Sequence, residues 1–187
     1  MVYSPWKGLI GLLKIIILSA VLMATAAPCM IQAEPAALEI PAHIQAERRS
    51  TFKSYMSWKS ITNRRSKQWA LQQEAWTDAN GLRRHGKHYI IAVGSGWGFK
   101  VGDIVKVSLS SGKTFTAVLG DSKSDRHTDK TNRYSRNGCW AEFIVDIPKL
   151  DPYVRRSGDI SNAGFPGYVV SIEKYAPKCW PMDIFLE

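Results

Sequence analysis

Residues 88–172 carry short apolar segments separated by turns that are rich in glycine, serine and aspartate. The segments 104–109 and 114–119 join through the compact connection Ser110–Lys113, which predicts a β-hairpin. We expect three further strands, over 88–93, 139–145 and 168–172. Short strands between glycine-rich turns favour a small barrel over a parallel sheet covered by helices. The fold class predicted is mainly β, a six-stranded barrel from about Tyr89 to Lys174.

Two helices are expected beside the strands. The run Ser66–Thr77 consists of good helix formers and places Trp69 and Trp76 seven residues apart on one face. A second, short helix is predicted over Ile147–Arg156, with Tyr153 and Val154 facing inward. The barrel therefore needs only one or two short helices to complete it.

The first 33 residues read as an export signal. Lys7 and Lys14 precede or interrupt an apolar stretch, and residues 15–27 carry no charge. A positive start, an apolar core and small residues near Ala26 or Ala33 are typical of a cleaved signal peptide. Residues 8–28 are also about long enough to span a bilayer as an uncleaved anchor. Both readings predict an N-terminal apolar helix and a protein that is secreted or tethered to the outer face of the cytoplasmic membrane.

The rest of the chain divides into a linker and one domain. Residues 34–50 contain two prolines and several alanines with little periodicity, which indicates a linker, and residues 51–187 are long enough for one domain with its own core. The net charge is +9, and +7 remains without Lys7 and Lys14, with 23 basic against 16 acidic residues. Such a charge favours anionic partners. We expect wall polymers or acidic lipid, and no specific nucleic acid.

Two of the three cysteines, Cys139 and Cys179, belong to the expected domain. An oxidising compartment would allow a disulfide between them, and two ordinary thiols are the alternative.

One aromatic residue stands apart from those expected in the core. Trp97 lies in the run Gly94–Gly98, where glycines allow a backbone to come close to a ligand. We group Trp97 and Gly96 with Lys123 and Asp125 as candidate substrate-binding residues.

Carboxyl groups follow two of the expected strands. Asp121 comes directly after one apolar strand and Asp146 after another, so both are expected half-buried at the barrel rim. Burial raises a carboxyl pKa, as a general acid near neutral pH requires, and two such groups in one cleft suit glycosidic bond chemistry. Capping of local backbone is the structural alternative. Both residues are candidate catalytic residues.

No cofactor or metal is expected. Asp125, His127 and Asp129 alternate and would share one side of an extended segment, as metal ligands could, but their polar, charged surroundings favour a solvated loop. The chain has no P-loop, zinc-type cysteine pairing or nucleophile elbow.

The order of motifs between Tyr89 and Asp146 resembles the three-aspartate domain. A strand is followed by Gly-x-x-x-Gly-Asp at 98–103, a hairpin, Gly-Asp at 120–121 and a strand that ends in Asp146. That domain is a double-psi β-barrel of cell-wall lytic transglycosylases, and it is related to expansins. More broadly, residues 54–174 resemble secreted clostridial-type proteins of unassigned function.

The resemblance implies roles for two residues. Asp121 matches the aspartate that opens the family's Asp-Thr-Gly-Gly loop, and Asp146 matches its later Ile-Asp aspartate. The first family aspartate falls near Gly94, where this chain has none, and Ser122–Ser124 replace the Gly-Gly pair. In the transglycosylases one carboxyl acts as acid and then base, so a single aspartate is enough.

Three functions are therefore weighed. The first is a lytic-transglycosylase-like enzyme that cleaves peptidoglycan with Asp146 or Asp121 as the acid. The second is an expansin-like, non-catalytic module that binds wall polysaccharide. The third is a membrane-tethered interaction protein. An enzyme of the first kind with paired carboxyls needs Asp121 and Asp146 to face one groove.

Overall fold

The computed structural model describes residues 38–39, 54–136 and 139–175. The expected apolar helix over 1–33, most of the linker over 34–50, and Cys179 lie outside these residues. Within the described ranges, no helix is long and apolar enough to cross a membrane.

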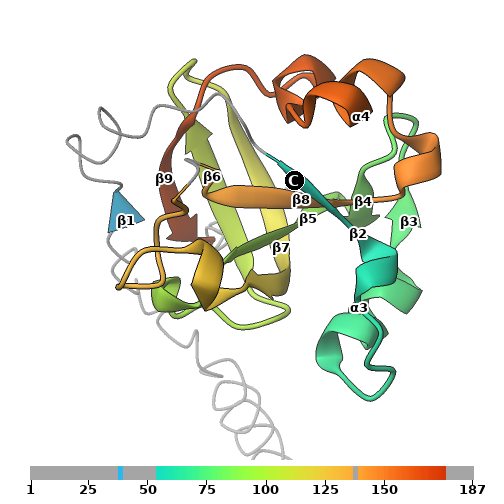
Figure 1. Ribbon diagram of the computed structural model, residues 1–187, viewed down its shortest axis with the longest axis horizontal. Coiled ribbons are helices and arrows are strands. Elements are labelled where there is room, and N and C mark those ends of the chain that lie inside the picture. Colours follow the sequence, from blue (N-terminus) through green and yellow to red (C-terminus); the bar gives the residue numbers. More distant parts are fainter. Residues whose placement is uncertain (1–37, 40–53, 137–138, 176–187) are drawn as a thin grey trace, which may run out of the picture. The chain divides into compact units, whose positions relative to one another are not determined.

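The domain is mainly β, as expected, and is built on one mixed sheet (Figure 1). The number of strands predicted, six, is wrong, because the sheet contains nine strands among the described residues. Their order is β1-β9-β6-β7-β5-β4-β3, and β8 pairs with both β5 and β2. The strands are β1 (Leu38–Glu39), β2 (Tyr55–Ser57), β3 (Trp76–Thr77), β4 (Arg83–His85), β5 (His88–Gly94), β6 (Ile104–Leu109), β7 (Thr114–Lys123), β8 (Ala141–Val145) and β9 (Val169–Lys174).

The helices are short and lie between the strands. The α-helices are α3 (Lys67–Glu74) and α4 (Pro152–Ser157), and the 3-10 turns are η1 (Trp58–Ser60), η2 (Ser95–Trp97), η3 (Asp125–His127), η4 (Ile147–Lys149) and η5 (Ile160–Ala163). Ser66 caps α3 by accepting from the Trp69 amide at 3.1 Å. The expected helix over 147–156 divides into η4 and α4, because Pro152 starts a new helix at a position where no amide donor is needed.

Strand β5 is the centre of the sheet. It runs parallel to β7 on one side and antiparallel to β8 and β4 on the other. The register with β7 shifts after the pair Ile91–Leu119, and the next pair is Ala92–Asp121. Gly120 is therefore the extra residue of a β-bulge. A Cβ at this position would lie 2.2 Å from Cγ2 of Ile90, so the bulge requires glycine.

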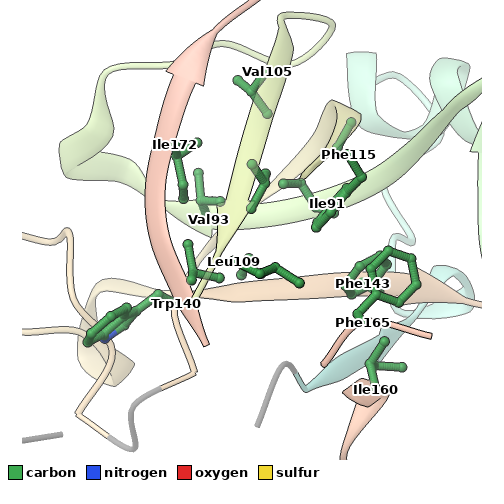
Figure 2. Packing of buried hydrophobic residues seen from close by; sticks show 14 of the residues in the cluster. Ile91, Val93, Val105, Leu109, Phe115, Trp140, Phe143, Ile160, Phe165 and Ile172 are labelled. Carbon is green, nitrogen blue, oxygen red and sulfur yellow. The ribbon is translucent and has the colours of Figure 1, made fainter. Parts of the chain in front are cut away.

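Alternate residues of the strands meet in a single core. The inward positions of β6 are Val105, Val107 and Leu109, and those of β8 are Ala141, Phe143 and Val145. Side chains from β5, β7 and β9 join the same cluster, so the sheet curls around it (Figure 2). Its centre is aromatic, with ring centroids 4.6–5.8 Å apart among Tyr89, Phe115, Phe143 and Phe165.

The outward face of the central strands is also covered. Ile90, Val118 and Ile144 pack there against Leu71 of α3 and Ile61. Both faces of β5, β7 and β8 are thus buried against apolar side chains in this region, which explains the nearly continuous apolar runs of these strands.

Replacing Phe143 by alanine tests the central packing. Phe143 is fully buried and contacts three aromatic rings, so Phe143→Ala should lower the free energy of unfolding by about 3–5 kcal/mol. The matched control is Tyr153→Ala, since Tyr153 is 56% exposed and its truncation should cost within about 0.5 kcal/mol. Equal effects of the two substitutions in denaturant unfolding would contradict this core.

Candidate functional site

A polar pocket of about 390 Å³ opens where β7 ends and β8 begins. We call it the basic pocket, since three of its six lining residues are cationic. The lining residues are Lys123, Arg126, His127, Ser135, Arg136 and Glu142. They come from β7, η3, the segment after it, and β8.

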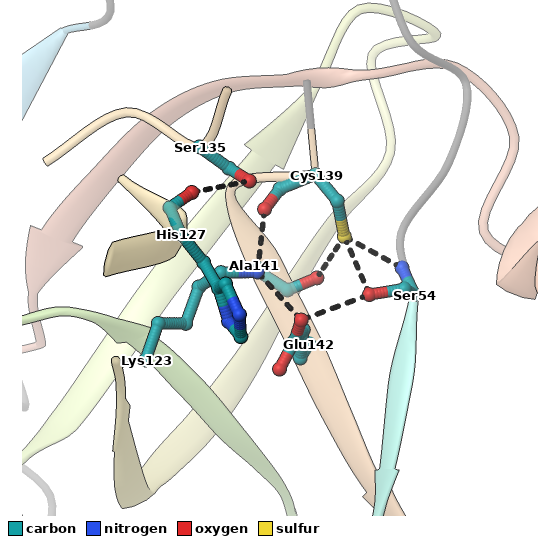
Figure 3. Close-up of polar contacts among 7 residues, drawn as sticks. All are labelled: Ser54, Lys123, His127, Ser135, Cys139, Ala141 and Glu142. Atoms are coloured by element: carbon teal, nitrogen blue, oxygen red, sulfur yellow. Dashed lines mark hydrogen bonds and ion pairs between the residues drawn. The ribbon is translucent and has the colours of Figure 1, made fainter. Parts of the chain in front are cut away.

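The floor of the basic pocket is a buried ion pair (Figure 3). The Nζ atom of Lys123 lies 2.6 Å from Oε1 of Glu142, and the lysine side chain is only 3% exposed. The same Nζ donates to the carbonyl oxygen of Cys139 at 2.8 Å. A buried ammonium needs such partners, because an uncompensated charge in the protein interior costs several kcal/mol.

Ser54 contacts both Glu142 of this ion pair and the neighbouring Cys139. Its hydroxyl donates to Oε1 of Glu142 at 3.1 Å, and its amide donates to Sγ of Cys139 at 2.7 Å. Burial raises the pKa of the Cys139 thiol, so this group is a neutral packing element at physiological pH. The predicted pairing of Cys139 with Cys179 falls outside the described residues.

The roof of the basic pocket is the segment 124–136, which we call the Asp129 loop. A β-bridge between Thr128 and Ser135 closes it. The Asp129 carboxylate accepts hydrogen bonds from the backbone amides of Arg133 and Tyr134 and from the Thr131 hydroxyl. Burial alone would raise the pKa of Asp129, but the hydrogen bonds outweigh it and lower the pKa.

The glycine-rich run after β5 anchors the Asp129 loop. A Cβ on Gly94 would lie 2.1 Å from the carbonyl oxygen of Asn132, and one on Gly96 would lie 1.9 Å from that of Thr131. The glycines therefore allow a neighbouring backbone, and not a ligand, to come close. Gly96 therefore has a packing role, and its part in substrate binding stays a prediction.

Trp97 is also placed differently from the expectation. Its ring is 5% exposed and packs edge-on against Tyr134, and its indole nitrogen donates to the carbonyl oxygen of Arg133 at 2.9 Å. The expectation of an open, ligand-facing ring is wrong, because the Asp129 loop covers it. Trp97 holds this loop in place.

The two predicted catalytic carboxyls lie at opposite ends of the sheet. β7 is parallel to β5 and β8 is antiparallel to it, so the ends of β7 and β8 point in opposite directions. Asp121 pairs with Ala92, which pairs with Glu142. Asp146 comes four residues after Glu142, about 13 Å further along the strand. Asp121 and Asp146 do not share a groove.

Glu142 takes the place beside Asp121 that was expected for Asp146. Burial raises the pKa of Asp121, hydrogen bonds from Ser122 and Gln68 oppose this, and the charge of Glu142 adds to the rise. Asp146, by contrast, lies near the buried guanidinium of Arg83, whose pKa burial lowers and the Asp146 charge raises. Asp146 thus interacts electrostatically with Arg83 at the opposite end of the sheet from Asp121.

The predicted binding residues Lys123 and Asp125 both lie at the end of the sheet that carries Asp121 and the basic pocket. Lys123 lines the basic pocket, and exposed Asp125 accepts from the Ser95 hydroxyl at 2.8 Å. No local sequence pattern pointed to Arg126, Arg136 or Glu142. Arginines within a polar segment are usually exposed to solvent. Only the folded Asp129 loop brings Arg126 and Arg136 to the same pocket.

No protein family, curated protein or solved structure matches this chain.

Asp129→Asn tests how the Asp129 loop is held. Replacing charge-assisted hydrogen bonds by neutral ones should lower the free energy of unfolding by about 1–2 kcal/mol at pH 7. Since the folded pKa lies below the ordinary value near 3.9, the contribution is complete above about pH 4. It disappears as the pH falls through the folded pKa, and the two proteins converge. Asp125→Asn is the control and should have a smaller effect, because the Asp125 carboxylate accepts only the hydrogen bond from Ser95 among the described residues. A difference that grows toward low pH would contradict this assignment.

Proposed function

We propose that this chain is an exported protein whose β domain binds anionic polymer of the cell wall. The signal-like residues 1–33, the net charge of +9 and the resemblance to wall-associated double-psi barrels support this. Two parallel strand pairs, β5–β7 and β2–β8, within an otherwise antiparallel sheet support assignment to that barrel class.

The basic pocket is the observation that carries the proposal. Lys123, Arg126 and Arg136 bring three positive charges to its lining, against the single carboxylate of Glu142. Converging cations in a concave site concentrate the field and attract anions. The Lys123–Glu142 pair satisfies one charge of each sign, which leaves the two arginines to attract a ligand.

Binding is favoured over cleavage by a pair of aspartates. Acid–base cleavage of a glycosidic bond with two carboxyls needs them about 5–9.5 Å apart across the scissile bond. Asp121 and Asp146 lie at opposite ends of the sheet, so they do not form this pair.

Sedimentation with insoluble cell wall tests the binding function. The full-length protein should co-sediment with wall that retains its anionic polymers, and the bound fraction should fall steeply between about 50 and 500 mM salt as charges are screened. Wall stripped of those polymers should bind much less. Equal binding to both preparations, or binding that is insensitive to salt, would contradict the proposal.

One observation favours a second function, glycan cleavage with Asp121 as the acid. Its pKa is raised by burial, and Glu142, which lies across β5 from Asp121, is a carboxylate that accepts from Lys123 and Ser54. Two neighbouring carboxyls in contrasting environments are typical of acid–base pairs. A lone acid would also satisfy the transglycosylase-like mechanism.

Mass spectrometry of peptidoglycan fragments tests the second function. If the protein cleaves glycan, anhydro-sugar ends should form, and Asp121→Asn should lower the rate by about 10²- to 10⁴-fold. Asp146→Asn is the matched control and should leave the rate unchanged. Absence of anhydro ends with the unmodified protein would remove the catalytic function and leave the binding function standing.

A further inference from the structure

We propose that the basic pocket is a specific site for a phosphate monoester whose organic part carries hydroxyl groups, such as a phosphorylated polyol or sugar. This inference rests on the proposed binding of anionic polymer and names the group of that polymer that the pocket takes, a phosphate monoester at a chain end, since phosphates within a chain are diesters with a single charge.

The two arginines supply the phosphate contacts. Nε of Arg126 donates to the Ser124 hydroxyl at 3.2 Å, and Nε of Arg136 donates to the Thr128 carbonyl at 2.9 Å. Each bond fixes a guanidinium to the Asp129 loop through one nitrogen. Within the described residues, the terminal nitrogens of both groups make no hydrogen bond. Two oriented guanidinium forks are the donors best matched to phosphate oxygens.

The charge of the pocket matches a dianion. Its three cations, Lys123, Arg126 and Arg136, and its one carboxylate, Glu142, sum to +2. A phosphate monoester carries about −1.5 to −2 at pH 7, whereas a carboxylate carries a single charge. A carboxylate ligand would therefore leave about one positive charge uncompensated in a partly buried site, which favours the monoester.

Glu142 gives the pocket a place for hydroxyl groups. Its Oε1 atom already accepts from Lys123 and Ser54, while its Oε2 atom makes no hydrogen bond to the described residues. Because Lys123 is fixed by Cys139 as well, the carboxylate is held at the pocket floor. An anionic acceptor repels phosphate but binds a hydroxyl, so it orients the organic part of the ligand.

The size of the pocket fits more than a bare anion. A volume of about 390 Å³ falls within the range of small-molecule sites, about 300–1,000 Å³. The arginines on the loop and Glu142 on β8 therefore leave room for a ligand that reaches from one to the other.

Calorimetric titration of the full-length protein at constant ionic strength tests this site. Glycerol 1-phosphate should bind more tightly than methyl phosphate, which lacks the hydroxyls, and glycerate, a carboxylate with the same hydroxyls, should bind most weakly. Replacing Arg126 and Arg136 by glutamine should weaken glycerol 1-phosphate binding by about a hundredfold, tenfold for each charged contact.

The control is the double replacement of Arg155 and Arg156 by glutamine, which removes the same charge outside the pocket lining. It should leave binding within about twofold, and both variants should keep the unfolding midpoint of the parent. Equal losses in the two variants, or glycerate binding as tightly as glycerol 1-phosphate, would overturn the inference. Salt-sensitive binding to wall polymer without binding of glycerol 1-phosphate would overturn this inference alone. Loss of both would also reject the proposed function.

Discussion

The Lys123–Glu142 ion pair determines how this end of the molecule is built. It joins the end of β7 to the start of β8 across β5, which lies between them. On β5, Gly94 pairs with Lys123 and Ala92 pairs with Glu142, and these two small residues leave room for the longer side chains to meet above them. Removing one partner would leave a buried charge uncompensated, at a cost of about 3–5 kcal/mol. The other four lining residues of the basic pocket all belong to the Asp129 loop.

The Asp129 loop adds the ligand-facing groups to this rigid floor. Its own carboxylate satisfies the backbone at the turn, while Gly94, Gly96 and Trp97 fix the loop against the end of β5. A binding residue on a loop is effective when the loop is held by a scaffold, because little ordering entropy is then lost on binding. The loop is polar in sequence but is positioned by packing.

The larger strands could be predicted from the sequence, since alternation of apolar residues is a local property. β6 was predicted with its observed bounds, and β7 proved four residues longer because the bulge at Gly120 continues the pairing. The strands β3 and β4 were missed because segments of two or three residues are too short to show an alternation of apolar and polar residues. Trp76 was predicted in the helix but belongs to β3, after the helix has ended at Glu74.

The candidate site was only partly predictable, for a topological reason. Strand ends were recognised as places for Asp121 and Asp146, but the relative direction of β7 and β8 follows from pairing with β5, which no local pattern reveals. Lys123 was selected as a candidate substrate-binding residue, and the structure gives it Glu142 as a partner. Arg126 and Arg136 were missed because only the closed loop brings them together.

A crystal structure of the protein with glycerol 1-phosphate would test the central claim most directly. We predict the phosphate oxygens within hydrogen-bonding distance of the guanidinium groups of Arg126 and Arg136, and a ligand hydroxyl on Oε2 of Glu142. The Lys123–Glu142 pair should remain intact beneath the ligand. An empty pocket at saturating ligand, or a phosphate bound elsewhere on the basic surface, would contradict the account.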